Sequence, residues 1–312
     1  MRRIKLAGRH VLITGGSAGI GLAVAKACML QLATVTLVAR TNSKLEAAQK
    51  ELQELAVSKQ LAVTVHIQAA DVTCEEQVLA AFAAAASSAG PIDVLVCNAG
   101  ISVPGYFHDQ SSKVFSSTMD LNYMGSVHAI KAVYEAMVRR NAGHICLVSS
   151  VLGTLGIIGY SSYAPTKYAI RGLADCLRNE LQGTGVTVSI AFPPDTDTPG
   201  FTQESASKPL ETKLISEDGS TLYSADKVAN CMVAGLMRGD YMLPTPDLML
   251  SIHARIVKAL SPRNFPGVLL DMTVGFLGPV IHWIYMASID GFSKKHAKAR
   301  YSQFWGPEAC SQ

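Results

Sequence analysis

The sequence predicts an α/β fold in which one parallel sheet of about seven strands is covered by helices on both faces. Two observations predict it. Short runs that are almost wholly apolar and rich in β-branched residues alternate with longer runs that have apolar residues at every third or fourth position. The chain has 312 residues, of which 49% are hydrophobic and 16% charged, and this is enough for one large domain.

The expected strands are short, as strands are when both faces of a sheet are buried. In chain order they are 10–14, 34–39, 63–70, 94–98, 144–149 and 186–191, with a seventh near 241–244. Helical spacing is clear in 45–55 and in 225–238, where Ser224 is expected to cap the helix and Gly239 to end it. Ser43 and Thr73 each precede a glutamate by three positions, which predicts two further N-caps.

Composition excludes several classes of protein. The net charge is +3, and no basic stripe is interleaved with aromatic residues, so no nucleic-acid partner is expected. The seven cysteines are scattered, without metal-ligand or redox spacing. The sequence therefore predicts no metal site, and it predicts reduced thiols in a protein that faces the cytosol.

A glycine-rich turn follows the first strand. In TGGSAGIG, residues 14–21, Gly15, Gly19 and Gly21 stand between a strand and an amphipathic helix. Glycines there let backbone amides approach a pyrophosphate, and the helix N-terminus faces it with its positive end. We expect a Rossmann-type dinucleotide site that includes Gly15, Ser17, Ala18, Gly19 and Ile20; the alternative is a glycine-rich turn without a ligand.

The end of the second strand predicts which dinucleotide is bound. A site for NAD would place an acid here to bind the ribose 2′-hydroxyl. The stretch LVARTNSK, residues 37–44, contains no acid, and the first one after it is Glu46. Arg40 and Lys44 suit a 2′-phosphate instead. The sequence therefore predicts NADPH, with a solvated basic turn as the alternative.

Two later strand ends also belong to the expected cofactor site. Asp71 is expected to accept a hydrogen bond from the adenine amino group beside the backbone of Val72, although it would serve equally as a helix N-cap. Asn98 begins the segment NAG, whose small residues would let the backbone lie close to the nicotinamide ribose.

Three polar residues predict proton transfer to a carbonyl. Ser150 follows the fifth strand, and Tyr163 and Lys167 are four positions apart and so share a helix face. The ammonium of Lys167 is expected to lower the pKa of Tyr163 and make the phenol an acid near neutral pH. Ser150 would donate to the carbonyl oxygen while a hydride reaches the carbon. A tyrosine and a lysine that merely share a helix surface are the alternative.

These motifs, TGGSAGIG, NAG, Asn122, Ser150 and Tyr163-x-x-x-Lys167, resemble the short-chain dehydrogenase/reductase family in type and order over about residues 8–245. The resemblance implies an oxidoreductase with Tyr163 as general acid. It also implies that Lys167 binds the ribose, that Ser150 orients the substrate and that Asn122 holds a proton-relay water. From the residues alone, Asn122 is equally a polar residue inside a helix.

The resemblance assigns 193–223 to a substrate lid. Where the family often has Pro-Gly, this chain has Pro193-Pro194, which stiffens the turn and removes an amide donor. Pro193, Thr196 and Thr198 are expected to line the cofactor. The lid resembles that of members which reduce a long-chain sphingoid ketone, 3-oxosphinganine, with NADPH. Another lipophilic ketone, such as a steroid or retinoid, and a non-catalytic NADPH sensor are the alternatives.

The end of the chain predicts a membrane-associated tail, 261–312, behind a catalytic domain of residues 1–260. Residues 265–289 are almost wholly apolar, but Asp271 and several prolines and glycines interrupt them, which favours an interfacial or re-entrant anchor. The basic stretch 294–300 would stay in the cytosol. We expect a protein of the endoplasmic reticulum membrane; a buried C-terminal helix or a homo-oligomer interface is the alternative reading of the tail.

Overall fold

The computed structural model describes residues 3–219 and 221–247, together with isolated positions between 250 and 296. Apart from such isolated positions, the predicted anchor 265–289 and the basic stretch 294–300 lie outside the described residues. Within the part of the chain that the structure describes, no helix is both long enough and apolar enough to cross a membrane.

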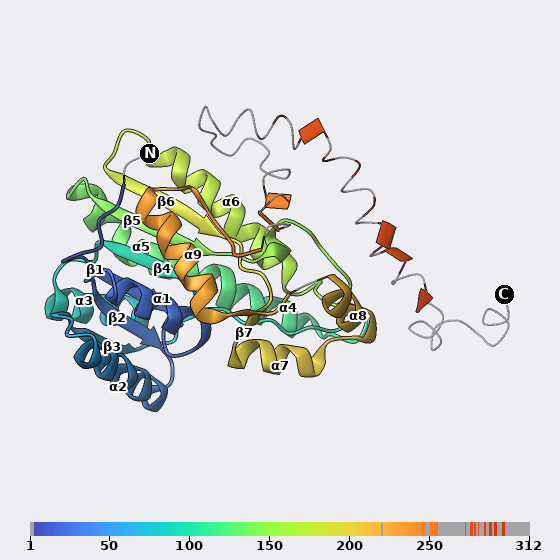
Figure 1. Ribbon diagram of the computed structural model, residues 1–312, viewed down its shortest axis with the longest axis horizontal. Helices are drawn as coiled ribbons and strands as arrows, with labels where there is room; N and C mark the ends of the chain where they lie inside the picture. The colour runs from blue at the N-terminus through green and yellow to red at the C-terminus, as the bar shows by residue number, and fades with distance from the viewer. Residues whose placement is uncertain are drawn as a thin grey trace, which may run out of the picture.

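The seven predicted strands form one parallel sheet, which confirms the predicted fold class (Figure 1). The order is β3-β2-β1-β4-β5-β6-β9, so it reverses between β1 and β4. In α/β sheets ligands bind beyond the carboxyl ends of the strands at such a reversal. The strands are β1 (His10–Thr14), β2 (Thr34–Ala39), β3 (Val65–Ala69), β4 (Val94–Cys97), β5 (Gly143–Val148), β6 (Val186–Ala191) and β9 (Met242–Leu243).

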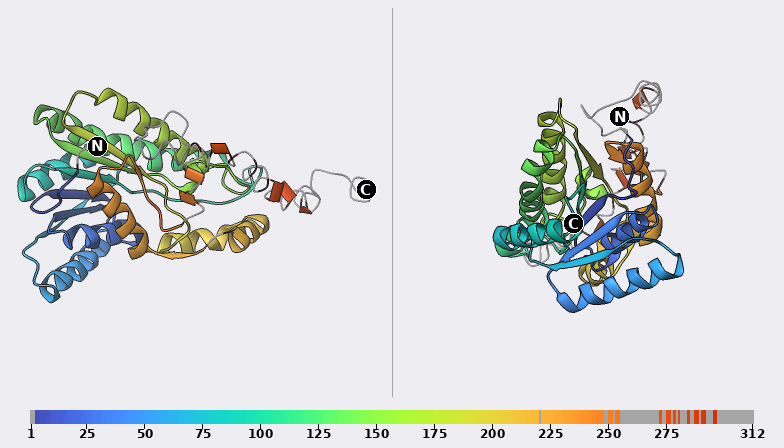
Figure 2. Two further views of the ribbon diagram at one scale, coloured as in Figure 1. Left: turned by 45° about the horizontal axis from the view of Figure 1, so that its top comes forward. Right: turned by 90° about the vertical axis from the view of Figure 1, so that its left-hand side faces the viewer.

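Helices cover both faces of the sheet (Figure 2). Successive strand residues point to opposite faces, so Val11 and Ile13 of β1 pack in one core while Leu12 packs in the other. The first core is completed by α1 (Gly19–Met29), α2 (Asn42–Ser58) and α9 (Ala225–Arg238), and the second by α3 (Glu75–Ala89), α5 (Gly125–Arg139) and α6 (Ala164–Glu180).

Shorter elements gather at the carboxyl edge of the sheet. There α4 (Ser112–Met119) runs into α5 through a π-helical turn, η1 (Asp120–Met124), and a 3₁₀ turn, η2 (Val151–Gly153), follows β5. The segment after β6 holds β7 (Thr196–Asp197), α7 (Pro199–Ser207), α8 (Leu210–Gly219) and β8 (Tyr223–Ser224). β7 pairs with β8 in a parallel two-stranded sheet, which the sequence did not predict because two residues show no periodicity.

The predicted helix ends were partly right. Ser224 accepts a hydrogen bond from the backbone amide of Lys227, and Gly239 ends α9 in the left-handed conformation, as predicted. The N-caps predicted at Ser43 and Thr73 are wrong. Helix α2 already includes Ser43, and α3 begins at Glu75 after the N-cap position Cys74, while the Thr73 hydroxyl donates to Asp71 (2.8 Å).

Candidate active site

The glycine turn after β1 has a backbone that side chains would not permit. Gly15 and Gly19 have φ angles of +65° and +54°. A Cβ on Gly15 would lie 2.9 Å from the Cα of Ala99, and one on Gly21 would lie 2.3 Å from the carbonyl oxygen of Gly15. These glycines therefore allow backbone segments to approach one another closely at this turn.

This turn is fixed to the end of β4. The Asn98 side-chain amide donates to the carbonyl oxygens of Thr14 (3.1 Å) and Gly15 (3.2 Å). The backbone amides of Asn98 and Ala99 both donate to the Thr14 hydroxyl, at 3.0 and 3.1 Å. Asn98 thus braces the glycine turn with its side chain, a role that the sequence did not reveal.

The turn and its helix fit the pyrophosphate of a dinucleotide. Helix α1 begins at Gly19 after Ala18, whose side chain offers no cap to the first amides. Those amides and the positive end of the helix dipole are the groups that bind phosphate in such folds. Ser17 and Ile20 are half-buried beside this end of α1, so the predicted phosphate-binding residues lie together.

The predicted adenosine-binding residues meet at the ends of β2 and β3. Arg40 and Lys44 are exposed, and a guanidinium nitrogen of Arg40 lies 3.9 Å from a carboxylate oxygen of Asp71. The other carboxylate oxygen of Asp71 accepts from the amide and hydroxyl of Thr73 (2.9 and 2.8 Å). Val72 is buried, and its carbonyl oxygen accepts from His128 (2.9 Å). Asp71 therefore stabilises the local turn, and its contact with adenine stays a prediction.

Ser150, Tyr163 and Lys167 lie together beyond the carboxyl end of β5. Tyr163 directly precedes α6, and Lys167 is one turn into that helix. The Lys167 ammonium is 5.5 Å from the centre of the Tyr163 ring and donates to the carbonyl oxygen of Val148 (3.1 Å). The Ser150 hydroxyl oxygen accepts from the amide of Leu152 (3.2 Å), and a hydrogen bond from Ser150 acts to lower the pKa of Tyr163.

The predicted lowering of the pKa of Tyr163 by Lys167 is wrong for this structure. Burial raises the pKa of Tyr163, and the nearby carboxylates of Glu204 and Asp195 raise it further. A hydrogen bond from Ser150 acts in the opposite direction but is outweighed. The phenol therefore stays protonated at neutral pH, which is the state that a proton donor needs.

The side chain of Lys167 is almost inaccessible to solvent. Its exposed fraction is 4%, and burial lowers its pKa from 10.5 to about 8. Because a buried ammonium is unstable without acceptors, this position requires polar neighbours. The carbonyl oxygen of Val148 is one of them.

Asn122 joins three segments of the site. It is 1% exposed, and its side chain accepts from the amide of Ile101 (2.8 Å) and donates to the Ile101 carbonyl (3.0 Å) and the Thr166 hydroxyl (2.9 Å). A Cβ on Gly100 would lie 3.0 Å from the Asn122 side-chain oxygen and 3.4 Å from the Lys167 ammonium nitrogen. Asn122 is thus near Lys167 within a π-helical turn, a feature common at functional sites; its water-holding role stays a prediction.

The three predicted lid residues lie at the start of the segment after β6. The carbonyl oxygen of Pro193 accepts from the amide of Val151 (3.2 Å), and Thr196 donates to the carbonyl oxygen of Pro194 (2.7 Å). Thr198 caps α7, and a Cβ on Gly19 would lie 3.1 Å from its Cβ. The segment that begins with Pro193 therefore reaches the glycine turn.

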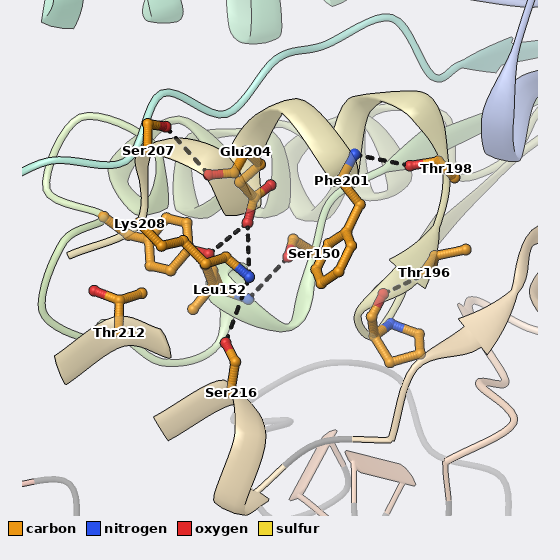
Figure 3. A network of polar contacts seen from close by, with 12 residues as sticks. Ser150, Leu152, Thr196, Thr198, Phe201, Glu204, Ser207, Lys208, Thr212 and Ser216 are labelled. Carbon is orange, nitrogen blue, oxygen red and sulfur yellow. Dashed lines mark hydrogen bonds and ion pairs between the residues drawn. The ribbon is translucent and has the colours of Figure 1, made fainter. Parts of the chain in front are cut away.

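A charged cluster in the lid was missed by the sequence reasoning (Figure 3). The Tyr160 hydroxyl donates to the Glu204 carboxylate, and the Lys208 ammonium lies 3.5 Å from the same carboxylate oxygen. Lys208 also donates to the Ser216 hydroxyl (3.4 Å). The centres of the Tyr160 and Tyr163 rings are 6.0 Å apart, so this cluster adjoins Tyr163, the predicted proton donor. The spacing of Glu204 and Lys208, four positions apart, is the sequence feature that could have predicted this ion pair.

Comparison with known families agrees with this geometry. The model of the short chain dehydrogenase family matches residues 9–209. The chain therefore belongs to the short-chain dehydrogenase family. Its fold and family imply a nicotinamide dinucleotide as cofactor.

Several individual proteins are similar to this chain over most of its length. A 3-dehydrosphinganine reductase from Danio rerio is 41% identical over 285 residues, which cover 88% of this chain and 85% of the relative. A 3-ketodihydrosphingosine reductase from Bos taurus is 41% identical over 240 residues, covering 76% of this chain and 71% of the relative. The crystal structure of levodione reductase superposes with a TM-score of 0.71 at 26% identity, covering 79% of this chain and 98% of that one.

Gly15→Ala should weaken dinucleotide binding at least about tenfold, because it places a Cβ against the Ala99 backbone at a φ of +65°. The dissociation constant, measured by fluorescence titration, checks this. Gly172→Ala in α6 is the control, since a Cβ there meets nothing within 4 Å. Unchanged affinity in Gly15→Ala would show that the turn does not bind the dinucleotide.

Lys167→Met should raise the free energy of unfolding at pH 7. The unfolded chain keeps the Lys167 proton up to pH 10.5, whereas the folded chain releases it near pH 8, so in the wild type stability rises with pH between these values. The difference between variant and wild type should therefore be largest below pH 8, roughly 3 kcal/mol at most, and shrink by pH 10.5. Urea unfolding at several pH values measures it, and a difference independent of pH would contradict the prediction.

Proposed function

We propose that this chain reduces 3-oxosphinganine to sphinganine with NADPH. Its support is the arrangement of Ser150, Tyr163 and the buried Lys167 beside the glycine turn, in a chain that resembles relatives named 3-dehydrosphinganine and 3-ketodihydrosphingosine reductase. The observation that carries the proposal is the buried Lys167 ammonium, 5.5 Å from the centre of the Tyr163 ring and bonded to the end of the strand that Ser150 follows.

The chain's own residues handle the substrate oxygen and its proton. Bound NADPH would supply a hydride to the carbonyl carbon. Ser150 orients the carbonyl by donating its hydroxyl proton in a hydrogen bond, which remains possible while its oxygen accepts from the amide of Leu152. Tyr163 transfers its proton to the carbonyl oxygen. The Lys167 ammonium then stabilises the tyrosinate that remains.

The preference for NADPH over NADH rests on the end of β2. Arg40 is exposed there, with 65% of its side chain accessible, and Lys44 follows in the first turn of α2. Both cations can meet a 2′-phosphate, and the carboxylate of Asp71, 3.9 Å from Arg40, holds the guanidinium beside the adenosine end of the site. No acidic side chain occupies 40–45, where a ribose 2′-hydroxyl would need one.

We also propose that the tail associates with the endoplasmic reticulum membrane and leaves the catalytic domain in the cytosol. The segment 265–289 is almost wholly apolar. Among its described positions, large apolar side chains recur every four residues and are exposed by more than half, which is the pattern of an apolar helix face in contact with lipid. They are Met272 (66%), Phe276 (86%), Val280 (57%) and Ile284 (58%).

Tyr163→Phe tests the function directly. It removes the proton donor and leaves the ring in place, so turnover of 3-oxosphinganine with NADPH should fall by several orders of magnitude while NADPH affinity changes little. Tyr168→Phe, an exposed tyrosine on the same helix, is the control. Turnover near the wild-type rate in Tyr163→Phe would assign the acid to another residue. A wild type that reduces a steroid ketone faster than 3-oxosphinganine would favour the alternative substrate class.

Arg40→Asp should reverse the cofactor preference, because an acid at the end of β2 repels a 2′-phosphate and accepts from a ribose hydroxyl. The ratio of kcat/KM for NADPH to that for NADH should fall at least about a hundredfold, as expected for the loss of a charge-assisted pair. Arg139→Asp, an exposed arginine on α5, should leave the ratio unchanged. An unchanged ratio in Arg40→Asp would show that Arg40 does not determine the preference for NADPH.

A further inference from the structure

A largely buried carboxylate lies next to the proposed proton donor and takes no part in the proton transfer described above. Glu204 projects from α7, and 16% of its side chain is exposed. Its hydrogen bond with the Tyr160 hydroxyl places it one ring away from Tyr163, because the centres of the two tyrosine rings are 6.0 Å apart. Figure 3 shows the carboxylate facing the Lys208 ammonium.

The surroundings of Glu204 disfavour its negative charge. Burial raises the pKa of Glu204, which shows that the carboxylate form is poorly solvated. Its charge also raises the pKa of Tyr163 and so opposes the formation of tyrosinate. Lys208 compensates it in part, but 3.5 Å is longer than the roughly 2.7–2.9 Å of a charge-assisted hydrogen bond. A second cation would complete the pairing.

The surroundings of Glu204 already accommodate an ammonium group. The Lys208 ammonium lies 4.2 Å from the centre of the Phe201 ring, a distance at which an aromatic face attracts a cation. Both side-chain contacts that Glu204 makes within the described residues end on one carboxylate oxygen, Oε1. A carboxylate offers acceptor positions on both oxygens.

If the proposed function is correct, the substrate brings this cation. In 3-oxosphinganine the carbon next to the ketone carries an amino group, which is protonated near neutral pH. When the ketone is bound at Tyr163, this ammonium must therefore lie within a few ångström of the carbonyl group. We propose that the Glu204 carboxylate binds the amino group of the substrate and makes the enzyme selective for long-chain amino ketones over ketones without the amine.

The same contact assigns an electrostatic role to the substrate. A bound ammonium neutralises Glu204 and removes much of the charge that disfavours tyrosinate at Tyr163. A ketone of equal chain length without the amine leaves Glu204 with only the partial compensation that Lys208 provides. The amine therefore contributes both to binding and to the proton transfer itself, so selectivity should appear in kcat as well as in KM.

Glu204→Gln tests the inference, because glutamine keeps an acceptor for Tyr160 and removes the charge. Its kcat/KM is measured with 3-oxosphinganine and with 1-hydroxyoctadecan-3-one, which lacks only the amine. The ratio of the two values should fall at least about tenfold, through loss with the amino ketone. A ratio equal to that of the wild type, or equal losses with both ketones, overturns the inference.

Glu211→Gln is the matched control. Glu211 is a second buried lid acid, it accepts from a tyrosine hydroxyl, that of Tyr106 (2.5 Å), and it is not among the charges that raise the pKa of Tyr163. Its variant should keep the wild-type ratio. A fall as large as that in Glu204→Gln would indicate general loosening of the lid and overturn the inference.

A binding measurement separates this inference from the proposed function. Sphinganine binding to the full-length protein in detergent, with NADP⁺ present, should weaken about tenfold in Glu204→Gln, while binding of octadecane-1,3-diol should not change. If the wild type reduces neither ketone, the proposed function fails, and this comparison still decides the role of Glu204. Equal sphinganine affinity in the variant and the wild type overturns the inference.

Discussion

The buried ammonium of Lys167 is the constraint on which the connection between β5 and α6 depends. An ammonium that is 4% exposed is tolerated only where backbone and side-chain acceptors replace water. The Val148 carbonyl at the end of β5 is such an acceptor, and the Ser149 hydroxyl ties the strand to the backbone of Lys167 at 2.9 Å. A Cβ on Gly153 would lie 2.8 Å from the Lys167 carbonyl oxygen, so only glycine at this position lets η2 pack this closely against α6.

Helix α7 connects the two halves of the site. Its cap, Thr198, packs on Gly19 at the phosphate end, and Glu204 reaches Tyr160 at the catalytic end. Six residues of α-helix span roughly 9 Å, so a short helix is enough to bridge the glycine turn and the tyrosine. The pairing of β7 with β8 closes the base of this segment. The placement of the lid over the site therefore depends on contacts at both ends of α7.

The sheet was predictable because burial on both faces leaves an unmistakable apolar pattern, and the residues at strand ends followed from the sheet. Ser150 and Lys167 meet because both follow β5, Ser150 at once and Lys167 in the first turns of α6, which is bonded back to the end of that strand. The charge balance was not predictable. Spacing showed that Lys167 is near Tyr163, but the burial that raises the pKa of Tyr163 and the approach of Glu204 arise from tertiary packing of a lid with no periodic pattern. The two-residue strand pair was too short to leave any pattern.

Tyr163 thus lies between charges of opposite sign that come from different parts of the chain. Burial disfavours tyrosinate, and Glu204 and Asp195 of the lid segment disfavour it further, while the Lys167 ammonium lies 5.5 Å from the centre of the ring. Lys167 is held there by its hydrogen bond to the carbonyl oxygen of Val148 at the end of β5. The effect of Glu204 depends on which cations accompany it, and Lys208 is only one of the candidates. The acidity of the proton donor is therefore set by what the lid encloses, and this allows the reaction to respond to the charge of the substrate.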